Sequence, residues 1–369
     1  MRELNALDFP LGPDLVTAIR QSVEKSEAFC VLDQRLSPRR RDEELALLGA
    51  TKVISSSGEV SLAGGQSVDD DIALVMLTSG SSGTPKAALH TWSSLEVSAR
   101  ITQTTLRSAT PPRWFPCLPA NHIGGLAVLL RSIFSDAELV WGPANALEEG
   151  PLLGATHISV VRAQLVRHDL SGYERVLLGG ARPPFELPEN VVTTWGMTET
   201  GSGVVYNGVP LPGVELTIVD GEVCVRSDTL FSRYRTAPRP VITGPDGRND
   251  WFPTGDAGTF ENGVLSIKGR LGFVINTGGE KVWPEDLEQV LGTVAGVKEV
   301  AVTGLPDEEW GEKIVALVVT DGSVSDDALK RAADEQIGPW AKPKEIRHVA
   351  ALPRTGNGKL RRADLKFLQ

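Results

Sequence analysis

The sequence predicts an α/β protein: a large N-terminal domain with α/β layers and a β-rich subdomain, followed by a small α+β C-terminal domain. Between residues 72 and 195, short apolar runs alternate with helical patterns, which favours layers built on a largely parallel sheet. Residues 214–268 show short strand patterns separated by Gly and Asp turns. Helix and strand patterns resume after residues 269–272, which predicts domains over 1–270 and 271–369.

The elements of the N-terminal domain follow from hydrophobic spacing. Residues 15–23 have helical spacing, residues 28–32 form a short apolar run, and residues 55–71, rich in Ser, Gly and Asp, predict a loop. Thr91 or Ser93 is the candidate N-cap of the next helix. The helices are expected at 91–106 and 123–134, and the strands at 72–77, 114–118, 157–161, 175–178 and 191–195.

The C-terminal domain has two predicted helices and three predicted strands. Pro284 opens a helix over 284–291, because proline is tolerated in a first turn. Ser325 and Asp326 cap a helix over 325–337. The strands are expected at 297–302, 314–319 and 346–349.

Composition and charge exclude several classes of protein. The 369 residues include 37 basic and 47 acidic ones, and the net charge of −10 argues against a general nucleic-acid or membrane-surface binder. No apolar run approaches the roughly 20 residues that span a bilayer, and we find no signal-peptide pattern. The three cysteines form neither a disulfide framework nor a zinc-ligand spacing, so we expect a cytoplasmic protein.

A tract rich in Thr, Ser and Gly, LTSGSSGTPK, follows the strand predicted at 72–77 and ends at Lys86. Its hydroxyl and backbone N–H groups suit a polyphosphate, and Lys86 adds a positive charge. It is not a Walker A loop, because Pro85 and Ala87 flank the lysine. The alternative, a flexible surface loop, is less favoured for a tract of this length directly after a strand.

Two aromatic motifs carry acidic side chains. In WGMTET, Trp195 and Gly196 suit a purine ring and Glu199 suits Mg²⁺ between phosphates; the alternatives are a core Trp195 and a solvated Glu199. In WFPTGD, Asp256 in a Gly turn suits the two hydroxyls of a ribose, and the alternative is an Asp that caps the turn.

Two glycine-rich segments follow. Residues 268–284 hold two Gly-rich turns around a short apolar strand, which suits a mobile connection. Residues 353–362 place two glycines just before Lys359. This segment is either a solvated basic tail or a flexible hairpin that delivers the ammonium group into a cleft.

In this order, the motifs resemble those of the adenylate-forming superfamily, which includes acyl-CoA synthetases, peptide-synthetase adenylation domains and luciferases. The resemblance implies an enzyme that makes an acyl-adenylate from a carboxylate and MgATP and releases pyrophosphate. A mobile C-terminal domain then allows coenzyme A to attack the adenylate, and AMP leaves. The expected partners are a small-molecule carboxylate, ATP and CoA, with no nucleic acid, no membrane and a possible homodimer. The matching segments are 78–86, 195–199 with Trp where Tyr is usual, 254–256, Arg270, 278–284 and Gly358-Lys359.

The resemblance also assigns roles to single residues. Lys359 would bridge the attacking carboxylate and the α-phosphate, and His122 would lie beside the acyl pocket, unless it is only a helix-start histidine. Glu199 would ligate magnesium, and Asp256 with Arg270 would hold the ribose. The expected ATP- and AMP-binding residues are Thr78, Ser79, Gly80, Ser81, Ser82, Gly83, Thr84, Lys86, Gly179, Gly180, Ala181, Trp195, Gly196, Met197, Thr198, Asp256 and Arg270. The expected CoA channel comprises Gly278, Gly279 and Glu280, and the expected hinge comprises Leu271 and Gly272.

Two departures from the family pattern narrow the prediction. The family usually has a hinge Asp or Lys where this chain has Leu271 and Gly272, although glycine still permits rotation. The segment before the phosphate tract is shorter than is usual. This compact form, with LPANHIGGLAVLLRS, resembles the o-succinylbenzoate–CoA ligases of menaquinone biosynthesis, particularly the actinobacterial ones. Arg131 and Arg162 are then candidates to hold the second carboxylate of such a substrate.

Three other functions stay open. They are an acyl- or aryl-CoA ligase for another substrate, an adenylating enzyme that loads a separate carrier protein, and a non-catalytic acyl- or nucleotide-binding regulator. Retention of Lys86, Glu199, Asp256 and Lys359 argues against the regulator, because binding alone would not need Lys359.

Overall fold

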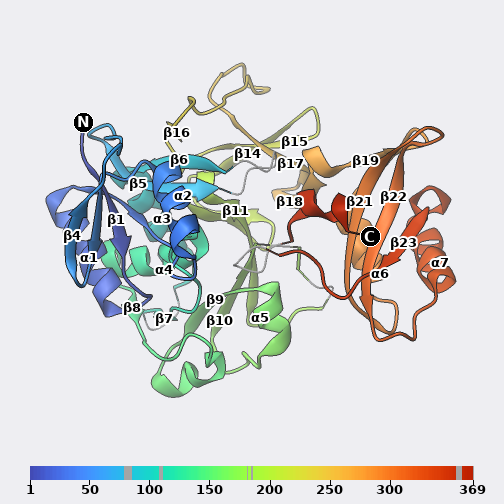
Figure 1. Ribbon diagram of the computed structural model, residues 1–369, viewed down its shortest axis with the longest axis horizontal. Coiled ribbons are helices and arrows are strands. Elements are labelled where there is room, and N and C mark those ends of the chain that lie inside the picture. The colour runs from blue at the N-terminus through green and yellow to red at the C-terminus, as the bar shows by residue number, and fades with distance from the viewer. Residues whose placement is uncertain (79–84, 108–110, 181, 184–185, 355–359, 369) are drawn as a thin grey trace. The chain divides into compact units, whose positions relative to one another are not determined.

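The structure, a computed structural model, describes residues 1–78, 85–107, 111–180, 182–183, 186–354 and 360–368 (Figure 1). The chain separates into two compact units. The first consists of Met1–Leu216, Val225–Phe252 and Asn262–Val264, and the second of Thr217–Cys224, Pro253–Glu261 and Leu265–Gln369. The domain boundary expected between residues 270 and 271 stays a prediction.

A seven-stranded sheet in the first unit has the order β16-β6-β5-β2-β1-β3-β4. Strands β5, β2, β1 and β3 pair in parallel, and β4, β6 and β16 join antiparallel at the two sides. The apolar sequence of β5 is almost entirely buried, as expected for an inner parallel strand. The strands are β1 (Leu4–Asp8), β2 (Ala28–Val31), β3 (Lys52–Ser55), β4 (Gly58–Ser61), β5 (Ile72–Thr78), β6 (Lys86–Thr91) and β16 (Arg233–Tyr234).

Helices cover both faces of this sheet. They are α1 (Pro13–Lys25), α2 (Pro38–Leu48), α3 (Trp92–Thr105) and α4 (Ile123–Phe134). Leu15 and Ile19, one turn apart on α1, share a core cluster with α3 and α4, whereas Leu48 of α2 belongs to a second cluster. Alternating residues of the strands enter the two clusters, which therefore lie on opposite faces. Thr91 accepts a hydrogen bond from the Ser94 backbone N–H at 3.1 Å, which confirms Thr91 as the N-cap of α3.

A second seven-stranded sheet of the first unit has the order β13-β12-β11-β10-β9-β7-β8. Pairing is parallel from β11 to β8 and antiparallel for β12 and β13. Helices α3 and α4 contact this sheet, and both also share a core cluster with strands of the first one, so they form a layer between the two. The strands are β7 (Arg113–Phe115), β8 (Glu138–Leu139), β9 (His157–Val161), β10 (Arg175–Gly179), β11 (Val191–Met197), β12 (Ser202–Tyr206) and β13 (Val209–Pro210). Short helices flank them: η1 (Leu147–Glu149), η2 (Pro151–Leu153), α5 (Arg162–Arg167) and η3 (Thr198–Thr200).

The β-rich region predicted for residues 214–268 is a sheet in the order β14-β15-β17-β18. Its strands are β14 (Glu215–Val219), β15 (Glu222–Arg226), β17 (Phe252–Glu261) and β18 (Val264–Arg270).

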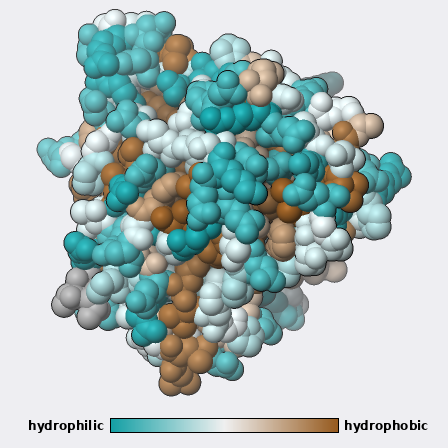
Figure 2. All heavy atoms as spheres, turned by 90° about the vertical axis from the view of Figure 1, so that its left-hand side faces the viewer, coloured by the Kyte–Doolittle hydropathy of each residue, from teal (hydrophilic) through white to brown (hydrophobic). Residues whose placement is uncertain are grey.

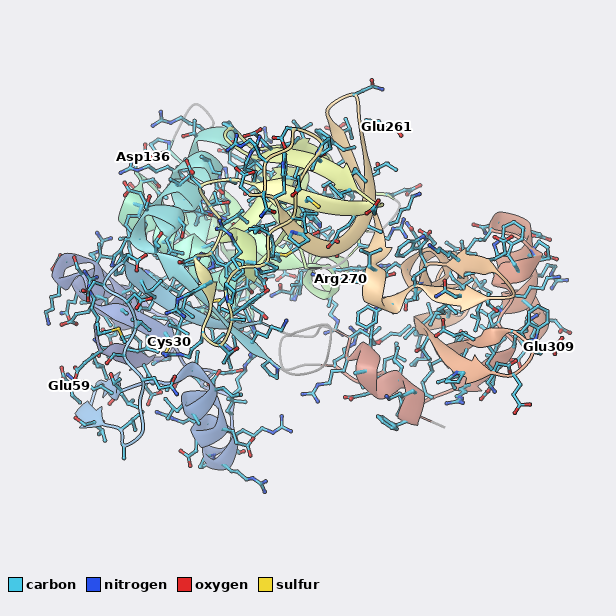
Figure 3. The ribbon with its side chains drawn as sticks, turned by 90° about the horizontal axis from the view of Figure 1, so that it is seen from above. Cys30, Glu59, Asp136, Glu261, Arg270 and Glu309 are labelled. Carbon is cyan, nitrogen blue, oxygen red and sulfur yellow. The ribbon has the colours of Figure 1, made fainter. Side chains whose placement is uncertain are left out.

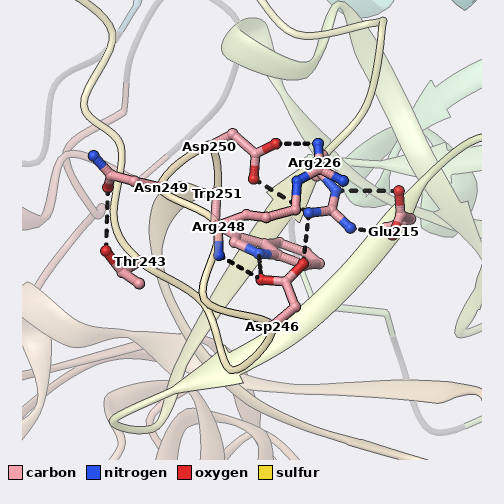
Figure 4. A network of polar contacts seen from close by, with 8 residues as sticks. All are labelled: Glu215, Arg226, Thr243, Asp246, Arg248, Asn249, Asp250 and Trp251. Atoms are coloured by element: carbon pink, nitrogen blue, oxygen red, sulfur yellow. Dashed lines mark hydrogen bonds and ion pairs between the residues drawn. The ribbon is translucent and has the colours of Figure 1, made fainter.

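Arg226 anchors the segment that leads into β17 (Figure 4). The Arg226 guanidinium forms ion pairs with Glu215 at 2.5 Å, Asp246 at 2.7 Å and Asp250 at 3.2 Å. Its Cζ lies 4.3 Å from the centroid of the Trp251 ring, whose Nε1 donates to Asp246 Oδ1 at 3.0 Å. Trp251, which precedes β17, is therefore held by Arg226 at its ring face and by Asp246 at its ring edge.

The second unit contains a sheet in the order β20-β19-β22-β21, with β23 paired to β22. Leu287 of α6 and Leu329 of α7 enter one core cluster, and Leu365 of η6 enters another. Ser325 accepts from the Ala328 backbone N–H at 3.3 Å and caps α7, as predicted. The elements are η4 (Leu271–Phe273), β19 (Ile275–Thr277), β20 (Glu280–Val282), α6 (Pro284–Leu291), β21 (Val297–Asp307), β22 (Gly311–Thr320), α7 (Asp326–Gln336), η5 (Pro339–Ala341), β23 (Glu345–His348) and η6 (Arg362–Phe367).

Three expectations from the sequence are corrected. The loop predicted at 55–71 contains β4, whose residues are all exposed, so no apolar pattern marks it. Asp256 lies within β17 rather than in a turn, because the strand continues through Gly255 at a φ of +77°. The parallel strands form two sheets rather than one, and β1 and α2 had no prediction.

The three cysteines, Cys30 (Figure 3), Cys117 and Cys224, are free and buried. Burial raises the pKa of Cys117 to about 12 and that of Cys224 to about 11, and it also raises the pKa of Cys30. On the face seen in Figure 2, hydrophilic residues predominate and hydrophobic ones show in narrow strips, as is usual for folded proteins. Among the described residues, no helix has the length and hydrophobicity needed to cross a membrane.

Candidate active site

Strands β5 and β6 carry the two ends of the predicted phosphate tract. Thr78 ends β5, Lys86 begins β6, and the two residues face each other in the antiparallel register. Thr78 is buried and Lys86 is exposed. The predicted residues between them, Ser79, Gly80, Ser81, Ser82, Gly83 and Thr84, lie outside the described residues.

Tyr234 connects Lys86 to Glu199, the predicted magnesium ligand. Strand β16 places Tyr234 opposite Ala88 of β6. The Tyr234 hydroxyl donates a hydrogen bond to Glu199 Oε1 at 2.9 Å, and Lys86 Nζ lies 5.1 Å from the centroid of the Tyr234 ring. Glu199 is 9% exposed. Its carboxylate is oriented by the neutral Tyr234 hydroxyl, and the Tyr234 ring lies beside the positive charge of Lys86. No motif in the sequence marked Tyr234, which stands 35 residues after Glu199.

His90 holds the turn that carries Glu199. Its ring is fully buried, with Nε2 2.8 Å from the Thr198 carbonyl oxygen and Nδ1 3.3 Å from Ser94 Oγ. Burial lowers the pKa of His90 to about 4, so the ring is neutral at pH 7 and must donate its N–H from Nε2 to the carbonyl. No motif in the sequence marked His90 for this role, because the histidine is an ordinary strand residue of β6.

The predicted adenine residues lie at the ends of two neighbouring parallel strands. Gly179 ends β10, and a Cβ there would lie 2.8 Å from Thr194 Oγ1 of β11. Trp195 is half-buried on β11, and the next residue must be glycine, since a Cβ on Gly196 would lie 2.2 Å from the Ser202 carbonyl oxygen. The carboxyl ends of parallel strands are a common place for ligands. Of the other predicted residues, Gly180 follows β10, Met197 ends β11, Thr198 begins η3, and Ala181 lies outside the described residues.

Asp256 and Arg270, both in the second unit, are joined by an ion pair. Arg270 Nε lies 2.8 Å from Asp256 Oδ1, and Arg270 Nη1 donates to the Thr254 carbonyl oxygen at 2.8 Å (Figure 3 labels Arg270). The backbone N–H of Gly255 donates to Glu222 Oε1 at 2.6 Å, which holds the left-handed residue in place. Asp256 is 6% exposed. Its carboxylate is therefore fixed in direction before any ligand binds.

The predicted CoA-channel residues lie on the β19–β20 hairpin. Gly278 and Gly279 form its turn with φ values of +58° and +87°, which favour glycine, and Glu280 begins β20. The Gly278 N–H donates to the Trp310 carbonyl oxygen at 2.9 Å, so the turn rests on the β21–β22 connection. The predicted hinge residues, Leu271 and Gly272, are exposed in η4.

Of the two predicted catalytic residues, only His122 belongs to the described part of the chain. His122 is half-buried at the N-cap position of α4, where the sequence expected a histidine at a helix start. Lys359 lies outside the described residues. Both catalytic roles stay predictions.

Arg131 is buried, whereas Arg162 is exposed. Arg131 projects from α4 with its Cζ 4.2 Å from the centroid of the buried Trp114 ring, and it is 3% exposed. Within the described part of the chain, its Nε and Nη1 have no hydrogen-bond partner. Burial lowers the pKa of Arg131, because the apolar surroundings disfavour its charge. A buried guanidinium with unused donors favours an anionic ligand beside it.

Comparison with known proteins places the chain in a family. The AMP-binding enzyme family matches residues 16–235, more than half of the chain. The chain belongs to the AMP-binding enzyme family. The C-terminal domain of AMP-binding enzymes matches residues 286–359. These matches confirm the family that the motifs resemble.

Relatives of this AMP-binding enzyme include a probable 2-succinylbenzoate–CoA ligase of Mycobacterium tuberculosis, 36% identical in an alignment of 351 positions that covers 87% of this chain and 88% of the relative. The o-succinylbenzoate CoA synthetase of Bacillus subtilis, solved with an acyl-adenylate intermediate, superposes with a TM-score of 0.85 at 25% identity, covering 100% of this chain and 88% of that chain. Its structure with ATP and a magnesium ion gives a TM-score of 0.85 at 24% identity, over 99% of this chain and 89% of that chain. The predicted fold class is therefore confirmed.

Proposed function

We propose that this AMP-binding enzyme is an AMP-forming acid–thiol ligase that converts o-succinylbenzoate to o-succinylbenzoyl-CoA in menaquinone biosynthesis. The Mycobacterium tuberculosis relative and the Bacillus subtilis acyl-adenylate complex support the reaction and the substrate. The observation on this chain that carries the substrate assignment is the buried Arg131, whose Nε and Nη1 lack partners among the described residues.

The reaction has two halves. A carboxylate oxygen of the substrate attacks the α-phosphorus of ATP, the bond to the β-phosphate oxygen breaks, and pyrophosphate leaves with its electron pair. The CoA thiol, having lost its proton, then attacks the acyl carbonyl carbon, and AMP leaves. In both halves negative charge builds up on oxygen atoms, so fixed positive charges and hydrogen-bond donors lower the barrier.

Lys86, Tyr234 and Glu199 would bind the phosphate end of ATP. Mg²⁺ commonly takes one or two carboxylates together with phosphate oxygens, and when bound it neutralises part of the phosphate charge. Glu199 fits such a site: its carboxylate is buried, and Tyr234 holds one of its oxygens at 2.9 Å. Lys86, whose Nζ lies 5.1 Å from the centroid of the Tyr234 ring, would add a second positive charge.

The nucleoside would be held by preformed groups. The Asp256 carboxylate, oriented by Arg270 at 2.8 Å, would accept the two ribose hydroxyls. The Trp195 ring would lie against adenine near Gly179 and Gly180, where the absence of side chains allows close approach of a flat ring.

Arg131 would bind the second carboxylate of o-succinylbenzoate, the one that is not adenylated. An arginine donates N–H groups to a carboxylate, and Nε and Nη1 of Arg131 are both without partners among the described residues. Trp114 holds the guanidinium from its face at 4.2 Å and leaves the in-plane donors for the ligand. Arg162 is exposed on α5, so we assign the role to Arg131 alone.

Other parts of the proposal rest on the family resemblance. Lys359 would bridge the attacking carboxylate and the α-phosphate, and His122 would lie beside the acyl group. Gly278, Gly279 and Glu280 would line the CoA channel. The cytoplasmic location and the homodimer also stay predictions; sedimentation of the purified protein would test the second.

Product analysis by mass spectrometry tests the proposal. Purified protein is incubated with MgATP, CoA and a panel of carboxylates that includes o-succinylbenzoate, with CoA-free controls. We expect o-succinylbenzoyl-CoA together with AMP. Adenylate that never becomes a thioester would indicate a carrier protein as acceptor, and the absence of AMP with every acid would refute the ligase.

A further inference from the structure

The predicted hinge segment of this chain contacts Arg362, an arginine near the C-terminus. The Asp or Lys that is usual at the hinge of the family is absent, and η4 holds Leu271, Gly272 and Phe273 instead. The Phe273 ring centroid lies 5.7 Å from Cζ of Arg362, the first residue of η6. This distance is within the range of a cation–π contact.

Arg362 is itself fixed by helix α6. Its Nη1 and Nη2 lie 2.8 Å from Oε1 and Oε2 of Glu288, a two-pronged pair, and Nη2 lies 3.1 Å from Glu285 Oε1. Nη1 also donates to the Val302 carbonyl oxygen at 3.3 Å. The three charged side chains are 15 to 18% exposed. Such a pair sets the plane of the guanidinium, and with it the surface offered to Phe273.

The same helix approaches the chain just before the hinge. Glu285 Oε2 is buried and has no hydrogen-bond partner among the described residues, and a Cβ placed on Gly269 would lie 2.6 Å from it. A cavity of about 100 Å³, lined by Gly272, Phe273 and Arg362 among others, lies beside the hinge. The segment is therefore held by one charged cluster rather than by tight packing on all sides.

We propose that Arg362, held by Glu285 and Glu288, is a positioning residue that sets how readily the hinge segment changes conformation between the two half-reactions. The proposal rests on the proposed ligase function. In this chain, the contact between Phe273 and Arg362 takes the place of the missing hinge side chain: it stabilises one backbone conformation of η4 and must be broken or remade when the chain turns there. Loss of a contact of this kind shifts a two-state equilibrium by about 3- to 30-fold.

The test separates the two half-reactions in the full-length enzyme. Adenylation is followed by o-succinylbenzoate-dependent exchange of pyrophosphate into ATP, and thioester formation by a single turnover of preformed adenylate with CoA. The variants are Phe273→Ala and Arg362→Lys, which keeps the charge but loses the two-pronged pair. Phe367→Ala is the matched control, because that ring, 73% exposed, lies 5.0 Å from Lys366 Nζ in the same unit.

We expect Phe273→Ala and Arg362→Lys to change the ratio of the two half-reaction rates at least about threefold, and Phe367→Ala to leave it unchanged. A ratio unchanged in Phe273→Ala, or equal losses in both half-reactions, would overturn the positioning role. Phe273→Ala removes a half-buried ring and no charge, so it keeps the test decisive if Arg362→Lys folds poorly. Absence of exchange in the wild-type enzyme would instead refute the ligase itself, and this proposal with it.

Discussion

Replacement of Arg131 by methionine is expected to stabilise the protein and to impair it as a ligase. Methionine is similar in length to arginine and carries no charge, so it removes a guanidinium that is 3% exposed and has two atoms without partners in the described part of the chain. Replacing buried charge by apolar side chains of similar volume stabilises proteins by about 1–4 kcal/mol. The cation–π contact with Trp114, at 4.2 Å, offsets about 0.5–2 kcal/mol of this gain, which leaves a net gain of about 1 kcal/mol at the middle of the two ranges.

The effect on activity has the opposite sign. Two hydrogen bonds between Arg131 and the second carboxylate contribute about 3 kcal/mol or more, which corresponds to a loss in kcat/KM on the order of a hundredfold for o-succinylbenzoate. An aromatic acid with one carboxylate, such as benzoate, lacks the group that Arg131 would bind. Its kcat/KM should therefore stay within about threefold of the wild-type value.

Two measurements on the same preparations decide the matter. Thermal unfolding of Arg131→Met and wild type gives the change in stability, for which we expect a Tm higher by about 2 °C or more. Initial rates of AMP formation with the two acids give the change in specificity. A variant with a lowered Tm, or one that loses both acids equally, would show that Arg131 supports the structure rather than the substrate.

Three further predictions concern the rest of the site. Tyr234→Phe removes the donor to Glu199 Oε1 at 2.9 Å and should lower the rate of pyrophosphate exchange about tenfold, with far-UV circular dichroism unchanged; an unaltered rate would exclude an orienting role. Asp256→Asn should raise the KM for ATP about tenfold or more and leave the KM for the acid unchanged, as initial-rate kinetics would reveal. The pKa of His90 is lowered from 6.5 to about 4, so only the unfolded state binds this proton as the pH falls below 6.5. The contribution of His90 to the free energy of unfolding is therefore fully present above pH 6.5 and declines by about 3 kcal/mol toward pH 4. Urea unfolding across this range should show a shallower decline in His90→Gln, and parallel curves would contradict the assignment.

Local sequence patterns predicted correctly those helices and strands whose formation depends mainly on residues within them or next to them. The apolar run of β5 and the Thr91 cap of α3 are examples, because burial and capping depend on neighbours in the sequence. Strand β4 escaped prediction because all its residues are exposed and only its pairing with β3 makes it a strand. The glycine at position 255 looked like a turn, but β17 continues past it because β15 and β18 pair with this strand on both sides.

The site shows the same division. Lys86, Glu199 and Asp256 stand in short motifs whose spacing carries the chemistry, so the sequence was sufficient to single them out. Tyr234 and His90 act through contacts with residues 35 and 108 positions away, which only the pairing of β16 with β6 and the placement of η3 create. Of the two candidate arginines, Arg131 is buried and Arg162 is exposed. The sequence could not distinguish them, because burial of a charged residue is a property of the whole fold.

The burial of all three cysteines has a practical consequence for measuring motion. Reaction with maleimides requires the thiolate, and the raised pKa values of Cys30, Cys117 and Cys224, together with their burial, make the native protein nearly inert to these reagents. A new cysteine in place of Glu59 and another in place of Glu309, both exposed and in different units, would then accept fluorescent dyes without removal of any native thiol. Energy transfer between the two dyes during turnover would test, in single molecules, whether the distance between the labelled positions changes in the catalytic cycle.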